Sequence, residues 1–326
     1  MPSEREFLEN IKHLVHGVKE AVLGFDEDAS DIPLSIDQSI VINIDTFVRE
    51  TDWLPNMTAA QVGRKTAVMT ISDVVAKGAE PRVSMLSLCV PKTYPDKEAE
   101  ELIRGFSQYC MKTGISFLGG DFGTAKDVIL TGVALGFAPP SGIIPRRGTK
   151  EGDIIAVTGD FGLTTVAFEH LLGGKDLSPE LRSDALAAAY NPHIHHHFVP
   201  ALAKKKAVNA SMDSSDGLGY TLHTMAKQSG LAFVIDSLPV PVEVTRFARE
   251  NLLDELSVVM LGGEEFTLVL SIPPEKWEIA IDIATQQKVS LQSIGYAQKG
   301  KGVKYESEEG YLDVPSSGYD NVRGWD

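Results

Sequence analysis

The residues of this chain that are best suited to chemistry are aspartates that follow or interrupt apolar stretches. The stretch Ile115–Gly123 (ISFLGGDFG) is the first example. Its apolar residues Ile115, Phe117 and Leu118 predict a short buried strand, and Gly119 and Gly120 predict a sharp turn after it. Asp121 would then stand at the carboxyl end of the strand, where α/β sheets place their ligands. An ordinary turn is the alternative for Gly-Gly-Asp.

Other aspartates recur in comparable settings, and they are Asp28, Asp45, Asp73, Asp213 and Asp216. Charged side chains beside long apolar runs are costly unless they are paired or bound to metal. A helix cap or a turn could explain any one of them alone. Asp73, however, lies inside the apolar segment TAVMTISDVVA, where it caps nothing. The set therefore predicts a shared cation site, and carboxylate oxygens suit Mg²⁺ rather than Zn²⁺.

The sequence has neither a GxxxxGK[ST] phosphate loop nor a kinase-type glycine-rich loop with its lysine. Carboxylates repel phosphate oxygens, so a nucleotide bound near these aspartates would need divalent cations between the two. Arg146 and Arg147 could clamp a phosphate, or they could be solvated charges on a linker. The loop Gly262–Glu265 could end a helix or meet a ligand.

Histidine and cysteine give weaker signals. In the run His193–His197, three histidines would share a face if the segment were helical, and they could then bind a transition metal. No Cys or acidic cluster flanks the run. We therefore favour a partly exposed helix start over a metal site. Cys89 and Cys110 are expected to be reduced, packed thiols, and a disulfide or metal pair is the alternative. No Ser/His/Asp or Cys/His arrangement is apparent from spacing.

Composition narrows the class of protein. The chain has 326 residues, of which 43% are hydrophobic, and a formal net charge of −15. This charge argues against nucleic acid or an anionic membrane surface as a partner. No stretch approaches the ~18 apolar residues of a membrane span. The charged N-terminal stretch lacks a secretory signal, so we expect a cytoplasmic protein.

The order of predicted elements indicates two α/β domains of the α+β type. In the first half we expect a helix over residues 1–23, strands at 39–47, 83–90 and 128–137, and helices at 58–77 and 96–113. The run 138–153, rich in Pro and Gly, predicts a boundary between domains at 1–140 and 141–326. Beyond it we expect strands at 153–158, 208–212, 233–236, 266–272 and 291–296, and helices within 163–206, from 218 and at 274–287.

Six motifs in order resemble the thiamine-monophosphate kinase family, which belongs to the superfamily of aminoimidazole ribonucleotide synthetase. They are IDTFV, KTAVMTISDVVAKGAEP, FLGGD, RRGTKEGD, DSSDGL and LGGEEF. The resemblance implies an N-terminal mixed-sheet domain that forms a homodimer and a C-terminal α/β domain. It also implies ATP-dependent phosphorylation of thiamine phosphate to thiamine diphosphate with several Mg²⁺ ions. The acceptor would be an already ionised phosphate oxygen, so no catalytic general base is expected.

The resemblance also assigns site residues. Its metal positions fall on Asp28, Asn43, Asp45, Asp73, Asp121, Asp213 and Asp216. Its nucleotide positions fall on Gly120, Asp121, Arg146 and Ser215. Its thiamine phosphate positions fall on Asp52, Glu264 and Tyr319.

The chain departs from the family pattern mainly on the acceptor side. Asn43-Ile44 replaces a Ser-Thr pair, Asp52 replaces a histidine, GGEDYEL has become GGEEFTL, and a Pro-x-Pro-Arg segment has become Pro192-His-Ile-His195. Two alternatives therefore stay open. One is an ATP-dependent enzyme of the same superfamily with a different phosphorylated or small-molecule acceptor, and the other is a nucleotide-binding regulator without turnover.

Overall fold

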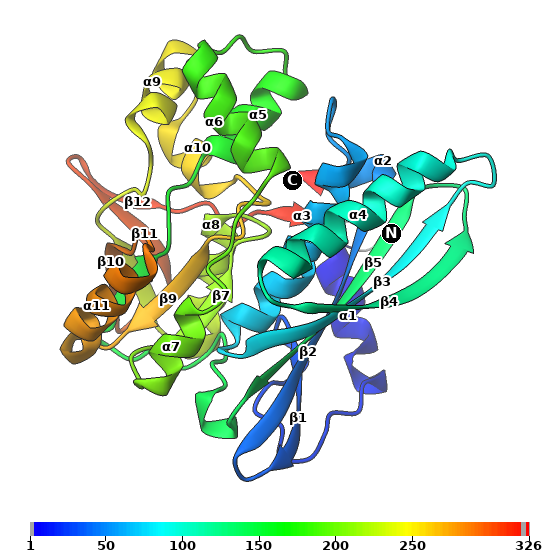
Figure 1. Cartoon of the computed structure of the whole chain (residues 1–326). Helices are drawn as coiled ribbons and strands as arrows, with labels where there is room; N and C mark the ends of the chain where they lie inside the picture. Colours follow the sequence, from blue (N-terminus) through cyan, green and yellow to red (C-terminus); the bar gives the residue numbers. More distant parts are fainter. Residues whose placement is uncertain (1–2, 321–323, 326) are drawn as a thin grey trace.

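The computed structural model describes residues 3–320 and 324–325, which form two halves that each contain a sheet and helices (Figure 1). The first half is built on a five-stranded sheet in the order β1-β2-β5-β3-β4. Its strands are β1 (Ser30–Ser35), β2 (Gln38–Val48), β3 (Glu80–Val90), β4 (Ser116–Thr124) and β5 (Ile129–Ala138). Only the β3–β4 pair is parallel, so the mixed sheet predicted for the N-terminal half is confirmed.

Two long helices, α3 (Ala59–Ala76) and α4 (Asp96–Lys112), cover one face of this sheet (Figure 1). Thr58 caps α3 and Gln61 closes the reciprocal capping box, as the predicted helix start requires. The two helices pack closely because Gly63 has no side chain. A Cβ atom there would lie 1.8 Å from the carbonyl oxygen of Leu102 on α4.

The other face of the sheet carries exposed apolar side chains. Ile44 on β2 pairs with Val133 on β5, which in turn pairs with Met85 on β3. Ile44 is 67% exposed, and Leu118 on the edge strand β4 is 64% exposed. Rows of apolar side chains that face water across several strands are typical of an interaction surface.

The second half contains a seven-stranded sheet in the order β12-β11-β8-β10-β6-β9-β7. Its strands are β6 (Ile154–Val157), β7 (Ala210–Asp213), β8 (Ala232–Ile235), β9 (Leu268–Ile272), β10 (Gln292–Gln298), β11 (Gly302–Ser307) and β12 (Gly310–Asp313). Its helices are α5 (Leu163–Leu171), α6 (Pro179–Tyr190), α7 (Phe198–Lys204), α8 (Leu218–Ser229), α9 (Val242–Glu250), α10 (Glu255–Met260) and α11 (Trp277–Gln287). Of these, α9, β11 and β12 were not predicted from the sequence, nor was β1 in the first half.

Helix α3 joins the two halves. It contacts β2, β3 and β5 on one side and α6, α7 and β7 on the other. The larger of two clusters of buried apolar side chains accordingly runs from Val41 on β2 to Ile272 on β9. The larger cluster therefore extends across both halves through α3, whereas the smaller one lies wholly in the second half.

Two other predictions differ from the structure. The turn expected after residue 118 does not form, because β4 continues through both glycines, and Gly119 (φ +98°) accompanies a shift in strand register instead. The N-terminal helix is also shorter than predicted, with α1 at Glu4–Ile11 and a 3₁₀ turn at Lys12–Leu14. Leu14 is 63% exposed, so no packing supports a longer helix.

The remaining elements are short: α2 (Arg49–Asp52), 3₁₀ turns at Pro140–Gly142 and Pro274–Lys276, and a small pairing of β13 (Tyr319–Asp320) with β14 (Gly324–Trp325). Among the described residues, the helices are all too short or too polar to span a membrane.

Candidate metal and nucleotide site

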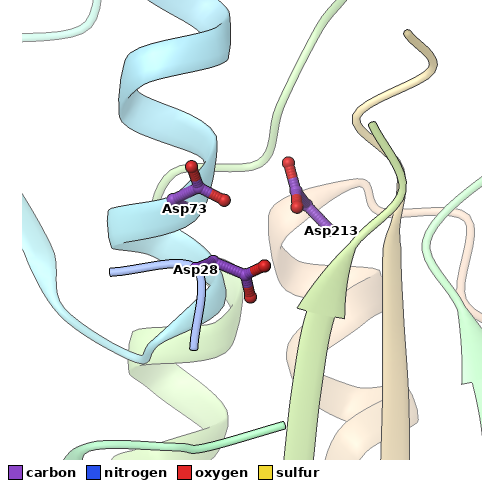
Figure 2. Close-up of side chains that lie close together, drawn as sticks. All are labelled: Asp28, Asp73 and Asp213. Atoms are coloured by element: carbon purple, nitrogen blue, oxygen red, sulfur yellow. The ribbon is translucent and has the colours of Figure 1, made fainter. Parts of the chain in front are cut away.

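Three aspartates from separate parts of the chain meet where the two halves join. Asp73 lies on α3, Asp213 ends β7, and Asp28 lies in the loop before β1 (Figure 2). One carboxylate oxygen of each lies within 4.8 Å of those of the other two. We call these three residues the acidic cluster. Helix α3 can carry a charge at this point because Asp73 faces other polar groups rather than the apolar core.

The neighbours of the acidic cluster fall into two kinds. Asp73 accepts a hydrogen bond of 2.7 Å from the amide nitrogen of Asn43, and Asp213 accepts one from the hydroxyl of Ser72. Asp28, in contrast, forms ion pairs with Lys77 and Arg146. Neutral donors therefore hold two of the carboxylates, and cations hold the third.

The electrostatics of the site oppose ionisation of its carboxyl groups. Burial, followed by the negative charges of Asp213 and Asp45, raises the pKa of Asp73 well above its ordinary value. Burial also raises the pKa of Asp45 to about 7; the N–H of Thr46 opposes this, and the charge of Asp213 adds to it. Burial is the main cause of both shifts, and the crowding of like charges adds to it.

The residues present fit divalent cations with oxygen ligands. The Oδ1 atom of Asp213 is buried and has no hydrogen-bond partner among the described residues. Carboxylate oxygens and the side chain of Asn43 are hard donors of the kind that Mg²⁺ accepts. A cation between Asp73 and Asp213 would relieve both the repulsion and the unpaired oxygen.

Asp121 and Gly120 lie apart from the acidic cluster within one chain. In the cross-strand pairing, Asp45 stands in a row with Gly132, Leu86 and Gly120. This row faces α3, because a Cβ at Gly132 would lie 2.1 Å from the hydroxyl of Thr70. Asp121 belongs to the next row and therefore points to the open face, on the edge strand farthest from β1.

A large cavity adjoins the acidic cluster. It has a volume of about 730 Å³ and is lined by α1, residues 25–27, Arg146, and the segment from Met212 to Gln228. Ser215 and Asp216 line it as well, so three of the residues predicted to bind nucleotide or metal share this space. Such a volume is typical of sites for small ligands.

A second, smaller hollow of about 70 Å³ brings together Asp52, Glu264 and Ser215, with Leu54 and Phe168 among the apolar residues that line it. Two of the three residues predicted to contact thiamine phosphate therefore lie together. The backbone of the third, Tyr319, forms part of β13, and its side chain lies outside the described part of the structure. Ser215 lines both spaces and links them.

Sequence reasoning missed two lysines on α3 and at its end. Lys65 is fully buried, and its ammonium lies 2.6 Å from Glu264 in the loop 262–265. Lys77, also fully buried, lies 2.9 Å from Glu27 and 2.5 Å from Asp28. The argument that singled out Asp73 applies to these two lysines as well, because a charged side chain in a buried helix needs a partner of opposite charge.

The remaining candidates have structural partners. Arg147 donates to the carbonyl of Val22 and lies 3.4 Å from Glu27. The histidine run precedes α7, with His197 at its cap, and His196 is buried against Tyr109. The predicted helix start is thus confirmed, and among described residues the run forms no metal-like group.

The two cysteines also match the favoured prediction. Both are free thiols, with Cys110 buried and Cys89 half-buried. The disulfide that the sequence left open is therefore not formed between them.

Comparison with known proteins finds relatives that match most of the chain. Residues 26–138 match the N-terminal domain, and residues 150–307 the C-terminal domain, of the family described as AIR synthase related protein. A thiamine-monophosphate kinase of Nitrosopumilus maritimus is 32% identical over 91% of this chain and 94% of its own length. One from Synechococcus elongatus is 30% identical over 80% of both chains.

Solved structures share the fold. The structure described as AaThiL complexed with AMPPCP and TMP has a TM-score of 0.84 and 22% identity, covering 98% of this chain and 97% of its own. That of tt0281 from Thermus thermophilus has a TM-score of 0.80 and 28% identity, covering 93% and 95%. The predicted two-part α/β architecture is confirmed by these neighbours.

Proposed function

Since this chain belongs to the thiamine-monophosphate kinase family, we propose that it transfers the γ-phosphoryl group of ATP to thiamine phosphate and forms thiamine diphosphate. The observation that carries this assignment is the acidic cluster beside a cavity of about 730 Å³, in a chain that is similar to such kinases along most of its length. The reaction belongs in the cytoplasm, where ATP is available.

ATP would bind in the large cavity. Arg146 and Ser215 supply a cation and a hydroxyl there, and both suit phosphate oxygens. The acidic cluster, with Asn43, Asp45 and Asp216 nearby, would hold Mg²⁺ at the phosphate end. Bound Mg²⁺ would supply neutralisation of the charge that develops on the transferring phosphoryl group.

The chain itself mainly aligns the two substrates. The phosphate of thiamine phosphate is already ionised at neutral pH, so the attacking oxygen needs no general base. Glu264 and Asp52 would face the positively charged thiazolium of the acceptor, and Phe168 offers an aromatic surface. Lys65 holds Glu264 in position through their ion pair. Proximity and orientation then account for much of the rate enhancement.

We also propose a homodimer that forms through the open face of the N-terminal sheet. Ile44, Met85 and Leu118 are exposed there, in a chain with a net charge of −15. A boundary near residue 140 fits the structure, since β5 ends at Ala138 and β6 begins at Ile154.

A substrate-panel assay tests the reaction. Purified protein, ATP and Mg²⁺ are incubated with thiamine phosphate and with other phosphorylated acceptors, and the products are identified by mass spectrometry. We expect thiamine diphosphate and ADP in equal amounts. Turnover of another acceptor alone would support the alternative that Asp52 motivates. Nucleotide binding without any turnover would instead support the regulator.

A further inference from the structure

Lys77 places an ammonium group inside the acidic environment that would hold metal. It follows Asp73 by one helical turn and caps the C-terminus of α3. Its nitrogen lies 2.5 Å from Asp28, 2.9 Å from Glu27 and 3.4 Å from the carbonyl oxygen of Ser211. The ammonium donates hydrogen bonds to Glu27 and to the carbonyl oxygen of Ser211, and its contact with Asp28 is an ion pair.

Lys77 divides the acidic cluster into a compensated and an uncompensated part. One oxygen of Asp28 pairs with Lys77 and the other with Arg146, and the carboxylate is 5% exposed. Asp73 and Asp213 accept hydrogen bonds from the neutral side chains of Asn43 and Ser72, and among the described residues neither forms an ion pair. Burial raises the pKa of Asp73, and the charge of Lys77 opposes this rise only in part. Among the described residues, the Oδ1 atom of Asp213 is buried with neither a hydrogen bond nor an ion pair, whereas the Oδ2 atom of Asp28, which also lacks a hydrogen bond, pairs with Lys77. The free coordination capacity of the cluster therefore lies on the side of Asp73 and Asp213.

We propose that Lys77 is a resident cation of the acidic cluster, whose ammonium occupies the place that a divalent ion would otherwise take at Asp28. Divalent ions are then held by Asp73 and Asp213, and Asp28 contributes little to their binding. This inference rests on the proposed use of the cluster for Mg²⁺. It specifies which residues determine how many ions bind and where they bind.

The competing explanation is that Lys77 serves only as a structural tie. Its contacts do connect three segments: the loop before β1, the end of α3, and β7. A structural tie would lose stability on substitution, whether or not divalent ions were present. A resident cation predicts something different, because a divalent ion can replace the missing ammonium.

Metal titration without substrates separates these explanations. Mn²⁺, a spectroscopic substitute for Mg²⁺, is titrated into the metal-free protein, and free Mn²⁺ is followed by electron paramagnetic resonance. We expect Lys77→Met to bind one additional Mn²⁺ per chain, or the same number at least ten-fold more tightly. Lys304→Met is the matched control, because it removes an ammonium that lies 2.6 Å from Asp313, an exposed residue on β12. Binding by Lys77→Met within two-fold of the wild type would overturn the proposal.

Loss of Lys77 leaves Glu27 and Asp28 buried without their lysine, and the variant could fail to fold in the absence of metal. The same substitution is therefore also made with Glu27→Gln, which removes one of the two charges. Melting temperatures are measured in EDTA and in Mg²⁺. We expect Mg²⁺ to raise the melting temperature of both variants by several degrees more than that of the wild type. An equal rise in all three proteins would favour the structural tie.

The second arm compares two aspartates in the presence of Lys77. Asp213→Asn should weaken Mn²⁺ binding at least ten-fold, whereas Asp28→Asn should change it less than three-fold. Equal losses would show that Asp28 is an ordinary ligand and would contradict the proposal. These titrations contain no ATP or thiamine phosphate, so failure of the kinase assay would leave their result intact, and the reverse also holds.

Discussion

Asp45 shows how the fold opposes the ionisation of a residue at the site. It lies on β2 in the row that faces α3, and burial raises its pKa to about 7. Unfolded aspartate ionises near pH ~3.9. Because the folded pKa is the higher one, the fold favours the protonated form. The contribution of Asp45 to stability is therefore greatest at low pH and is lost as the pH rises toward 7.

This sign gives a pH-dependent prediction. In EDTA, the free energy of unfolding should fall between pH 5 and 8, and Asp45→Asn should reduce that fall because Asn does not ionise. At pH 8 we expect the variant to be more stable than the wild type by about 2 kcal/mol or less. Urea denaturation of both proteins at several pH values measures the fall in the free energy of unfolding and the difference between them at pH 8. Parallel pH profiles for the two proteins would show that Asp45 stays ionised at no cost.

At the scale of elements, α3 positions most of the site. It carries Lys65, Ser72 and Asp73, with Lys77 at its cap, and both halves contact this one rigid helix. Its placement depends on its close packing against α4, which Gly63 permits. A substitution at this contact should therefore destabilise the protein.

Gly63→Ala tests the contact. The new methyl group would meet the carbonyl oxygen of Leu102 at 1.8 Å, so the helices must separate. We expect destabilisation by about 2–3 kcal/mol, as overpacking of a filled core produces. Gly17→Ala is the control, because nothing lies within 4 Å of its added Cβ. Chemical denaturation gives both values, and equal midpoints would contradict the importance of this contact.

The same elements show what the sequence could predict. The start and end of α3 followed from Thr58 and Gly78, because capping chemistry is local. The course of the chain after residue 118 could not be predicted in this way. Gly-Gly is as compatible with a bulge as with a turn, and the pairing of β4 with β3 determines which of the two forms. Asp73 and Asp213 could be named as candidates from the apolar runs beside them, and Asp28 from its place in the set of recurring aspartates. Their meeting, and the lysines that partner the site, depend on tertiary contacts.

At the scale of the whole molecule, the open face of the N-terminal sheet and the position of Asp121 have a common consequence. Asp121 points to the same face as Thr46, Thr131 and Ser87, in the row next to the exposed apolar residues. The acidic cluster lies on the other side of the sheet. If Asp121 binds metal or nucleotide, as the family resemblance implies, it must do so across the proposed dimer interface rather than within its own chain.

Subunit complementation tests this expectation. Asp121→Asn and Asp213→Asn should each be nearly inactive alone as homodimers. After the two are mixed, dissociated and reassociated, a hybrid dimer contains one site in which both aspartates are intact, provided that Asp121 acts in trans. Random pairing makes half of the dimers hybrid, so about a quarter of the wild-type activity should return.

Sedimentation and native mass spectrometry supply the control, since they must show that hybrids have formed. If Asp121 acted within its own chain, every site in the mixture would carry one defect and no activity would return. A hybrid that forms but stays inactive would therefore contradict action in trans, and a chain that sediments as a monomer would contradict the dimer itself. Asp121 faces away from its own cluster on the edge strand of a sheet whose uncovered side is apolar. For that geometric reason we expect activity to return.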